Sequence, residues 1–189
     1  MAGRGRLFVI SAPSGAGKTT LVKRILNRFG SLSYSVSHTT RKPRKNEIHG
    51  QDYFFVTPHE FRAKIDRGEL LEWAQVHGNY YGTSKEAVET MLDRGENIIL
   101  DIDVQGAEKI MNSSLDPVTI FIMPPDSETL AQRLEKRGTD SAQVIAKRLE
   151  NAEAEMKKKD NYQYVIVNDD LDTTAEQLAQ IFKREMAGT

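Results

Sequence analysis

The chain has 189 residues, of which 39% are hydrophobic and 28% are charged, a composition typical of one globular domain with a sizeable core. Its formal net charge of −1 argues against a broad nucleic-acid-binding surface, and no apolar run is long enough to span a bilayer, so we expect neither a nucleic-acid nor a membrane partner. The absence of cysteine excludes disulfides and thiolate metal sites, and with no apolar signal segment before Leu7 it favours a cytoplasmic protein.

The first predicted elements are a buried strand at residues 7–10, a glycine-rich turn, and a helix that begins near Lys18. Such a turn directs several backbone N–H groups at one point, where the helix dipole adds positive charge, and this suits a polyphosphate. The turn has the spacing of a P-loop except that Ala12 stands in place of the first glycine. A flexible turn with a solvated lysine is the alternative, but it would leave the strand–turn–helix context unexplained.

Within the P-loop, we expect Lys18 to reach the β- and γ-phosphates and the Thr19 hydroxyl to hold Mg²⁺. The residues expected to bind the phosphates are Ala12, Pro13, Ser14, Gly15, Ala16, Gly17, Lys18, Thr19 and Thr20.

A polar segment at residues 37–53 contains four basic residues within five positions: Arg41, Lys42, Arg44 and Lys45. Pro43 stiffens the segment and keeps it from forming a helix. Two guanidinium groups on a stiff loop suit capture of a phosphate, although an exposed basic loop would give the same pattern.

Residues 34–83 interrupt the alternation of strands and helices and predict a small, mostly antiparallel insertion. Glu72 lies there in a strand-like run, where burial without a partner would be costly. A buried carboxylate accepts two hydrogen bonds from guanine, at N1–H and the exocyclic amine, and adenine offers no matching pair. On composition alone, Glu72 is equally well placed as a surface residue of a strand.

Three further buried strands are predicted at residues 98–101, 118–123 and 164–167, with a weaker one at residues 34–37. Their alternation with helical patterns predicts an α/β fold with a parallel sheet flanked by helices. Capping-box patterns predict helix starts at Thr57, Thr83 and Thr173.

An acid ends the strand at residues 98–101, and Asp101 at the carboxyl end of a parallel strand is placed to orient Mg²⁺ through water. The four histidines show no metal-ligand spacing. Residues 126–157 are helical and strongly charged, which composition alone would assign to a solvated face.

Taken together, these segments resemble the guanylate kinases, P-loop kinases that make GDP from GMP. The resemblance covers nearly the whole chain and rests on several segments in the same order: SAPSGAGKTTL, VSHTTRKPR, HGQDYFF, EWAQVHGNYYGT, ILDIDVQG, RLEKRG and VIVNDDLD. It implies a P-loop core at residues 1–33, 84–125 and 157–189, a GMP-binding region at 34–83, and a mobile helical lid at 126–156. The family tolerates Ala12.

The resemblance also implies roles for individual residues, with ATP as the phosphoryl donor and Mg²⁺ as the cofactor. It places Arg41, Arg44, Tyr53 and Tyr81 at the GMP phosphate, and Ser37, Glu72, Thr83 and Asp103 around the guanine. It further implies that Lys18, Arg41, Arg137 and Arg148 are catalytic, and that Asn168 and Asp169 lie at the ATP base.

Two alternatives remain at the level of sequence. Guanylate-kinase-like domains of scaffold proteins bind peptides without catalysis, but they have lost residues that are present here, Lys18, Arg41 and Asp101 among them. A kinase of another nucleotide acceptor would share the P-loop and differ at the base. The sequence does not decide whether the chain is a monomer or a homo-oligomer.

Overall fold

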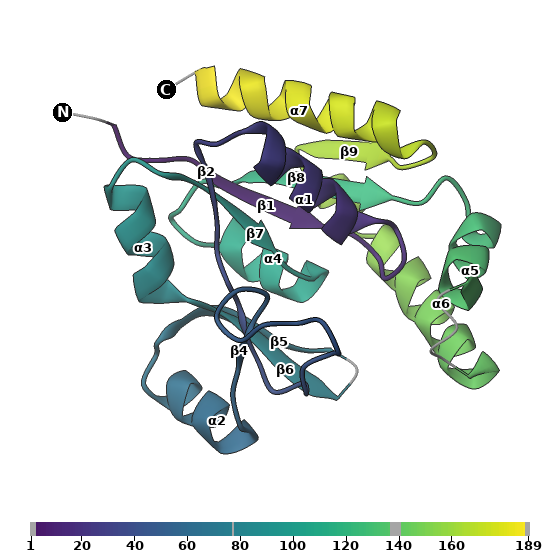
Figure 1. Ribbon diagram of the computed structural model, residues 1–189, viewed down its shortest axis with the longest axis horizontal. Helices are drawn as coiled ribbons and strands as arrows, with labels where there is room; N and C mark the ends of the chain where they lie inside the picture. Colours follow the sequence, from purple (N-terminus) through teal and green to yellow (C-terminus); the bar gives the residue numbers. More distant parts are fainter. Residues whose placement is uncertain (1–2, 77, 137–140, 188–189) are drawn as a thin grey trace.

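The computed structural model describes residues 3–76, 78–136 and 141–187 and contains two sheets (Figure 1). The larger sheet has the strand order β2-β7-β1-β8-β9, and every neighbouring pair in it is parallel. Its strands are β1 (Leu7–Ser11), β2 (Leu32–Tyr34), β7 (Asn97–Asp101), β8 (Val118–Met123) and β9 (Tyr164–Val167). The predicted parallel sheet and four of its five predicted strands are confirmed.

Helices cover both faces of this sheet (Figure 1). The helices α1 (Lys18–Arg28) and α7 (Leu171–Ala187) lie on one face, and α3 (Lys85–Asp93) and α4 (Val104–Met111) lie on the other. Because successive side chains of a strand point to opposite faces, Phe8 and Ile10 join the first layer while Leu7 and Val9 join the second.

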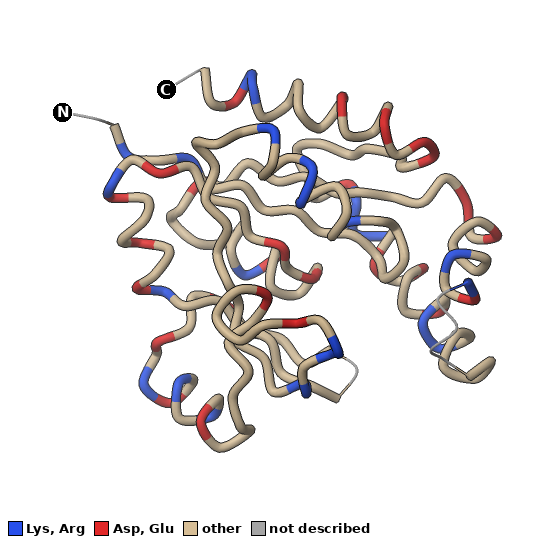
Figure 2. Tube along the Cα trace, in the orientation of Figure 1, with Lys and Arg blue, Asp and Glu red and all other residues tan. Residues whose placement is uncertain are grey.

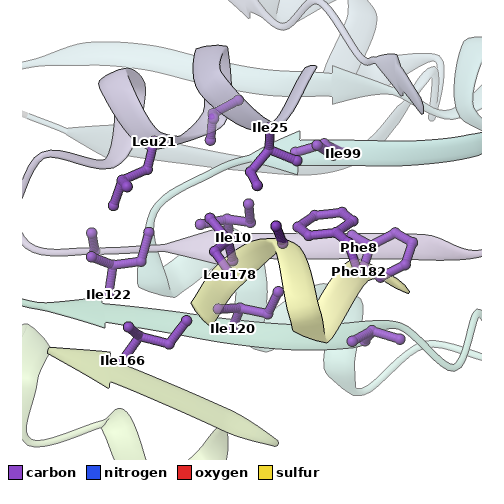
Figure 3. Close-up of a cluster of buried hydrophobic side chains, with 14 of the residues drawn as sticks. Phe8, Ile10, Leu21, Ile25, Ile99, Ile120, Ile122, Ile166, Leu178 and Phe182 are labelled. Carbon is purple, nitrogen blue, oxygen red and sulfur yellow. The ribbon is translucent and has the colours of Figure 1, made fainter. Parts of the chain in front are cut away.

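The core between the sheet and the α1–α7 layer is built from aliphatic and aromatic side chains (Figure 3). Phe8 from β1 stacks on Phe182 from α7 with ring centroids 4.3 Å apart, and both rings are fully buried. These contacts hold β1, and with it the turn that follows, against the C-terminal helix.

The smaller sheet has the strand order β4-β3-β6-β5 and lies below the larger one in Figure 1. Its strands are β3 (His38–Thr39), β4 (Phe54–Phe55), β5 (Leu70–Val76) and β6 (Asn79–Ser84), and α2 (Pro58–Asp66) belongs to the same region. Two of its pairs are antiparallel and one, β3–β4, is parallel, so the insertion is mixed.

Two helices, α5 (Ser127–Lys136) and α6 (Ala142–Met156), form a hairpin beside the carboxyl edge of the large sheet (Figure 1). Leu130, Leu134 and Ala152 bury a small core between them. A one-turn helix, η1 (Lys159–Asn161), leads from this hairpin to β9. None of the helices in the described ranges is long and apolar enough to cross a membrane.

Three local predictions are corrected. The weak strand at residues 34–37 is instead β2 at Leu32–Tyr34, because Leu32 packs into the core while the chain leaves the sheet after Ser35. The cap of α3 is Ser84, whereas Thr83 still pairs within β6. Helix α7 begins at Leu171, ahead of Thr173, whose N–H is held by the Asp170 carboxylate at 2.8 Å.

The predicted capping box at Thr57 is confirmed. The Thr57 hydroxyl accepts from the Glu60 N–H, and the Glu60 carboxylate accepts from the Thr57 N–H. The reciprocal bonds satisfy two backbone donors at the start of α2.

Candidate functional site

The turn between β1 and α1 presents unpaired backbone donors to one space. Gly17 precedes the first turn of α1 and has no side chain to cap it, so the N–H groups at this end are available to an anion. The turn is closed by a bond from the Ala16 N–H to the Pro13 carbonyl at 3.1 Å.

Two glycines of this turn are required by their conformation and by their neighbours. Gly15 and Gly17 have φ of +98° and +93°, in the region that L side chains rarely adopt. A Cβ at Gly15 would also lie 2.9 Å from Leu130 of α5, and one at Gly17 would collide with the Asn168 amide. The glycines at these two positions of the turn therefore have a steric cause in two distant elements.

Lys18 lies over the carboxyl end of β7. Its Nζ is 2.6 Å from the Asp101 carboxylate and donates to the Ile102 carbonyl at 2.9 Å. Both charged side chains are mostly buried, with exposed fractions of 20% for Lys18 and 12% for Asp101. The two residues that the sequence assigned to phosphates and metal are thus in direct contact.

Two more carboxylates lie near this pair. Asp103 caps α4, accepting from the Gly106 N–H at 2.9 Å. Glu155, from the last turn of α6, lines the same space, and burial together with the charge of Asp103 raises its pKa to about 7 against the opposing effect of Lys18. Glu155 thus brings the helical hairpin to the pocket at the carboxyl edge of the sheet.

Glu72 of β5 is buried, with 4% of its surface exposed. Thr83, opposite it in β6, donates its hydroxyl to Glu72 Oε1 at 2.6 Å. Burial raises the pKa of Glu72 to about 7, against the hydrogen bond from Thr83, which favours the ionised form. The surface-strand alternative for Glu72 is therefore excluded.

The basic loop between β3 and β4 is organised by an acid of its own, Glu47. Arg41 donates to Glu47 Oε1 at 2.8 Å, and the Arg44 N–H donates to Glu47 Oε2 at 2.7 Å. The hydrogen bond to Glu47 raises the pKa of Arg41. Burial alone would raise the pKa of Glu47, but the bonds from Arg41 and Arg44 outweigh burial and hold the pKa of Glu47 below its ordinary value. The Arg44 side chain is 70% exposed, whereas that of Arg41 is 16% exposed.

Aromatic rings connect this loop to the sheet. The Arg41 guanidinium lies 5.4 Å from the centre of the Tyr53 ring, and Tyr53 meets Tyr81 edge to face at 6.0 Å. Burial raises the pKa of Tyr53 to about 12, so its hydroxyl stays protonated and able to donate near neutral pH. Basic residues gather in this loop and along α5 and α6 (Figure 2).

One continuous pocket joins the turn to the small sheet. Of the residues proposed from sequence, it is lined by Ala12, Pro13, Ser14, Gly15, Gly17, Lys18, Thr19, Thr20, Ser37, Tyr53, Glu72, Tyr81, Asp101 and Asp103. Thr83 and Ala16 are fully buried behind this wall, and Val76, Gly82, Ile102 and Glu155 complete it.

The remaining proposed residues lie outside the pocket wall. Arg41 and Arg44 are on the basic loop, and Arg148 is half-buried on α6. Asn168 is 3% exposed and donates its side-chain amide to the Ala16 carbonyl at 2.6 Å, while Asp169 is exposed beside it. Arg137 lies outside the described residues.

The donors near the turn fit a magnesium ion that is held mainly by phosphate groups and water. Thr19 and Asp101 both line the pocket. Among residues 3–76, 78–136 and 141–187, no cluster of three or more acidic or histidine side chains could form a protein cage for a metal. Mg²⁺ typically uses one or two carboxylates with substrate phosphates and water, so this sparse donor set is compatible with it.

Sequence reasoning did not find Glu47, Glu155 or Gly106 at the site. Glu47 follows the basic run closely, and this spacing was a usable signal for an internal partner. Glu155 and Gly106 come from helices whose position depends on long-range packing, and nothing local marks them.

Comparisons with known proteins agree with the geometry. A family model described as guanylate kinase matches residues 4–185. The chain is 47% identical over 185 residues to the guanylate kinase of Geobacter metallireducens, covering 98% of this chain and 91% of that protein. It is 48% identical over 184 residues to the guanylate kinase of Escherichia coli K12, covering 96% and 89%.

A solved structure shares the fold. The crystal structure of guanylate kinase from Anaplasma phagocytophilum superposes with a TM-score of 0.82 at 36% identity, over 97% of this chain and 87% of that one.

Proposed function

The chain belongs to the guanylate kinase family and transfers a phosphoryl group from ATP to GMP, and we propose here which of its residues carry out the reaction. The observation that carries the proposal is that one pocket is lined by cation and backbone donors at one end and by a buried acceptor at the other. One end is lined by the anion-binding turn and Lys18, and the other by the buried carboxylate of Glu72.

We assign the turn at residues 12–20 to the ATP phosphates. Its open N–H groups and the Lys18 ammonium neutralise the charge that spreads over the transferring group. Asn168 supports the turn through the Ala16 carbonyl, and with Asp169 it marks the side at which we place the ATP base.

The acceptor base is assigned to Glu72. The ionised carboxylate accepts from the N1–H and the exocyclic amine of guanine, while the Thr83 hydroxyl donates to Oε1. Ser37 and Asp103 line the same end and complete the polar surroundings. Adenine would leave the buried carboxylate with the Thr83 hydroxyl but without the two donors of guanine, and such lost hydrogen bonds are a strong basis for rejecting a wrong base.

The GMP phosphate is assigned to Arg41, Arg44, Tyr53 and Tyr81. A phosphate monoester is largely dianionic near neutral pH because its second pKa is about 6, so its oxygen needs no protein base to become a nucleophile. The difficulty is repulsion between two anions, and guanidinium groups reduce it while orienting the acceptor.

Mg²⁺ is proposed as the cofactor, with the Thr19 hydroxyl and, through water, Asp101 as its protein contacts. When bound, it would neutralise charge on the donor phosphates. The other proposed cations come from residues 126–156, where Arg137 and Arg148 approach the transferring group when the α5–α6 hairpin closes. Closure would exclude water, which competes as an acceptor.

The proposed division of the chain follows from these assignments: a core at residues 1–33, 84–125 and 157–189, a GMP-binding region at 34–83 and a lid at 126–156. We also propose a cytoplasmic location, where both nucleotides are available and the absence of cysteine is unremarkable.

The test is an acceptor panel. Purified chain with ATP and Mg²⁺ is assayed for ADP release with GMP, AMP, CMP and UMP. We expect turnover with GMP and little with the others. Equal turnover with AMP would overturn the assignment of Glu72 to the base.

A second assay tests the turn. Lys18→Ala should nearly abolish turnover while circular dichroism and GMP binding remain close to wild type, because Lys18 acts on the transferring group. A near-normal kcat in this variant would contradict the assignment of the turn.

A further inference from the structure

Gly106 occupies an unusual position for a glycine. It is the third residue of α4 and, within the part of the chain that the structure describes, the only glycine inside a helix. It is not among the described glycines with positive φ, so its backbone conformation is open to any residue. Glycine here is less favourable for the helix than alanine, which raises the question of what the missing side chain allows.

The space that a side chain would take is filled by the carboxylate of Glu72. A Cβ built on Gly106 would overlap Glu72 Oε2, would lie 3.0 Å from Glu72 Cδ, and would be 3.3 Å from Asp103 Oδ1. Both oxygens belong to residues that line the base end of the pocket. The space left by the missing side chain is thus occupied by one functional group, the Glu72 carboxylate.

Neither element can move away to make room. Val104, Ala107 and Ile110 bury α4 against the large sheet with exposed fractions of 6% or less. Glu72 is anchored in β5, which pairs with β6 on one side and packs against α4 on the other. The softest response to a new Cβ is therefore rotation of the Glu72 carboxylate away from α4.

We propose that Gly106 is a specificity-determining residue of the kinase: its bare backbone lets the Glu72 carboxylate lie against the start of α4, in the orientation that accepts from the guanine edge. Gly106 acts through Glu72 and is a positioning residue, not a catalytic one. This inference rests on the assignment of Glu72 to the guanine under Proposed function.

The experiment compares Gly106→Ala with the wild-type chain. We expect the KM for GMP to rise by roughly ten- to a hundredfold, because an active group displaced by about 1 Å can lose that much. The KM for ATP should stay at its wild-type value. IMP keeps the N1–H but has no exocyclic amine, and the ratio of kcat/KM for GMP to that for IMP should decrease in Gly106→Ala. The melting temperature of the variant should not fall.

A matched control is available at Gly30. A Cβ there meets nothing within 4 Å, and Gly30 is also outside the positive-φ set, so Gly30→Ala should leave every kinetic constant unchanged.

A double-mutant cycle tests whether the effect passes through Glu72. In a Glu72→Ala background, Gly106→Ala should cause no further rise in the KM for GMP. An unchanged KM and GMP/IMP ratio in Gly106→Ala would overturn the inference, as would an equal effect with and without Glu72. If instead Glu72→Ala itself leaves GMP kinetics unchanged, the assignment of Glu72 fails, and the two failures are distinguishable.

Discussion

A carboxylate of the basic loop, Glu47, holds the guanidinium that we assign to the GMP phosphate. Arg41 is mostly buried between Glu47 and the Tyr53 ring, so its direction is set by neighbours on both sides. A pre-oriented guanidinium loses less side-chain freedom when it binds an anion.

We therefore expect Arg41→Ala to raise the KM for GMP by roughly ten- to a hundredfold, the cost of one charge-assisted contact. Arg41→Lys should recover only part of this loss, since it restores the charge but not the planar fork. Steady-state kinetics measure both. The control is Arg67→Ala, which breaks an exposed ion pair with Glu69. A KM for GMP that is unchanged in Arg41→Ala would refute the role of Arg41.

Glu72 predicts a dependence of stability on pH. Its pKa rises on folding from an ordinary 4.5 to about 7, so between these values the folded chain binds more protons than the unfolded chain. The free energy of unfolding should then fall as the pH rises from about 5 to 8, by at most about 3 kcal/mol from this group. Denaturant titrations of the wild type and Glu72→Gln compare the slopes.

The Glu72→Gln variant should lose a large part of that slope, and Glu155, whose pKa is also raised to about 7, accounts for a further share. The same variant should lose GMP turnover selectively, because it puts a donor where guanine needs an acceptor. A slope that is identical with and without Glu72 would contradict the buried ionisation.

At the level of elements, the turn that we assign to the ATP phosphates depends on the end of β9. The side-chain amide of Asn168 donates to the Ala16 carbonyl. The backbone carbonyl of Asn168 accepts from the Arg133 side chain of α5 at 3.0 Å. The turn, the end of the last strand and the helical hairpin therefore meet at one residue, Asn168.

Asn168→Ala should lower the free energy of unfolding by roughly 1–3 kcal/mol, because it leaves the buried Ala16 carbonyl without a partner. It should raise the KM for ATP more than that for GMP. Asn112→Ala is the matched control, since that amide bonds an exposed carbonyl of α4. Equal changes in both KM values would argue that the contact is only structural.

The capping box of α2 allows a test of stability separate from activity. Thr57→Ala should lower the free energy of unfolding by about 1 kcal/mol and leave kcat unchanged, because α2 packs through Phe61 on Tyr80 rather than on the pocket. A loss of kcat without a loss of stability would reverse this assignment.

Across the whole molecule, the pattern of the core was predictable from sequence and the contacts of the site were not. A continuous apolar run that includes Phe8 and Val9 identifies β1, because each face of a parallel sheet meets a helix layer. The strand at residues 34–37 was misplaced because Tyr34 and Val36 are residue types that strands favour, while Leu32 is the residue that packs.

The contacts Glu72–Gly106, Arg41–Glu47 and Asn168–Ala16 depend on how separate elements meet. Residue types alone left a surface role open for both Glu72 and Arg41, and it was the resemblance to the guanylate kinases that made them functional candidates. The partner that each of these side chains contacts is decided by packing between elements, and the local sequence does not predict it.

Binding of substrate should stabilise the whole fold. GMP at about a hundred times its Kd should raise the free energy of unfolding by about 2.7 kcal/mol if it binds the folded chain alone. Thermal denaturation with and without GMP measures the shift, and Glu72→Ala should reduce it at the same GMP concentration. A full shift in that variant would mean that the base does not contact Glu72.

The bond between Asn168 and Ala16 joins residues 152 positions apart. During synthesis, the segment near the N-terminus leaves the ribosome long before its partner has been made. The nascent turn must wait for the 152 residues that follow Ala16 before that bond can form. The turn therefore gains this support only after Asn168 has been synthesised.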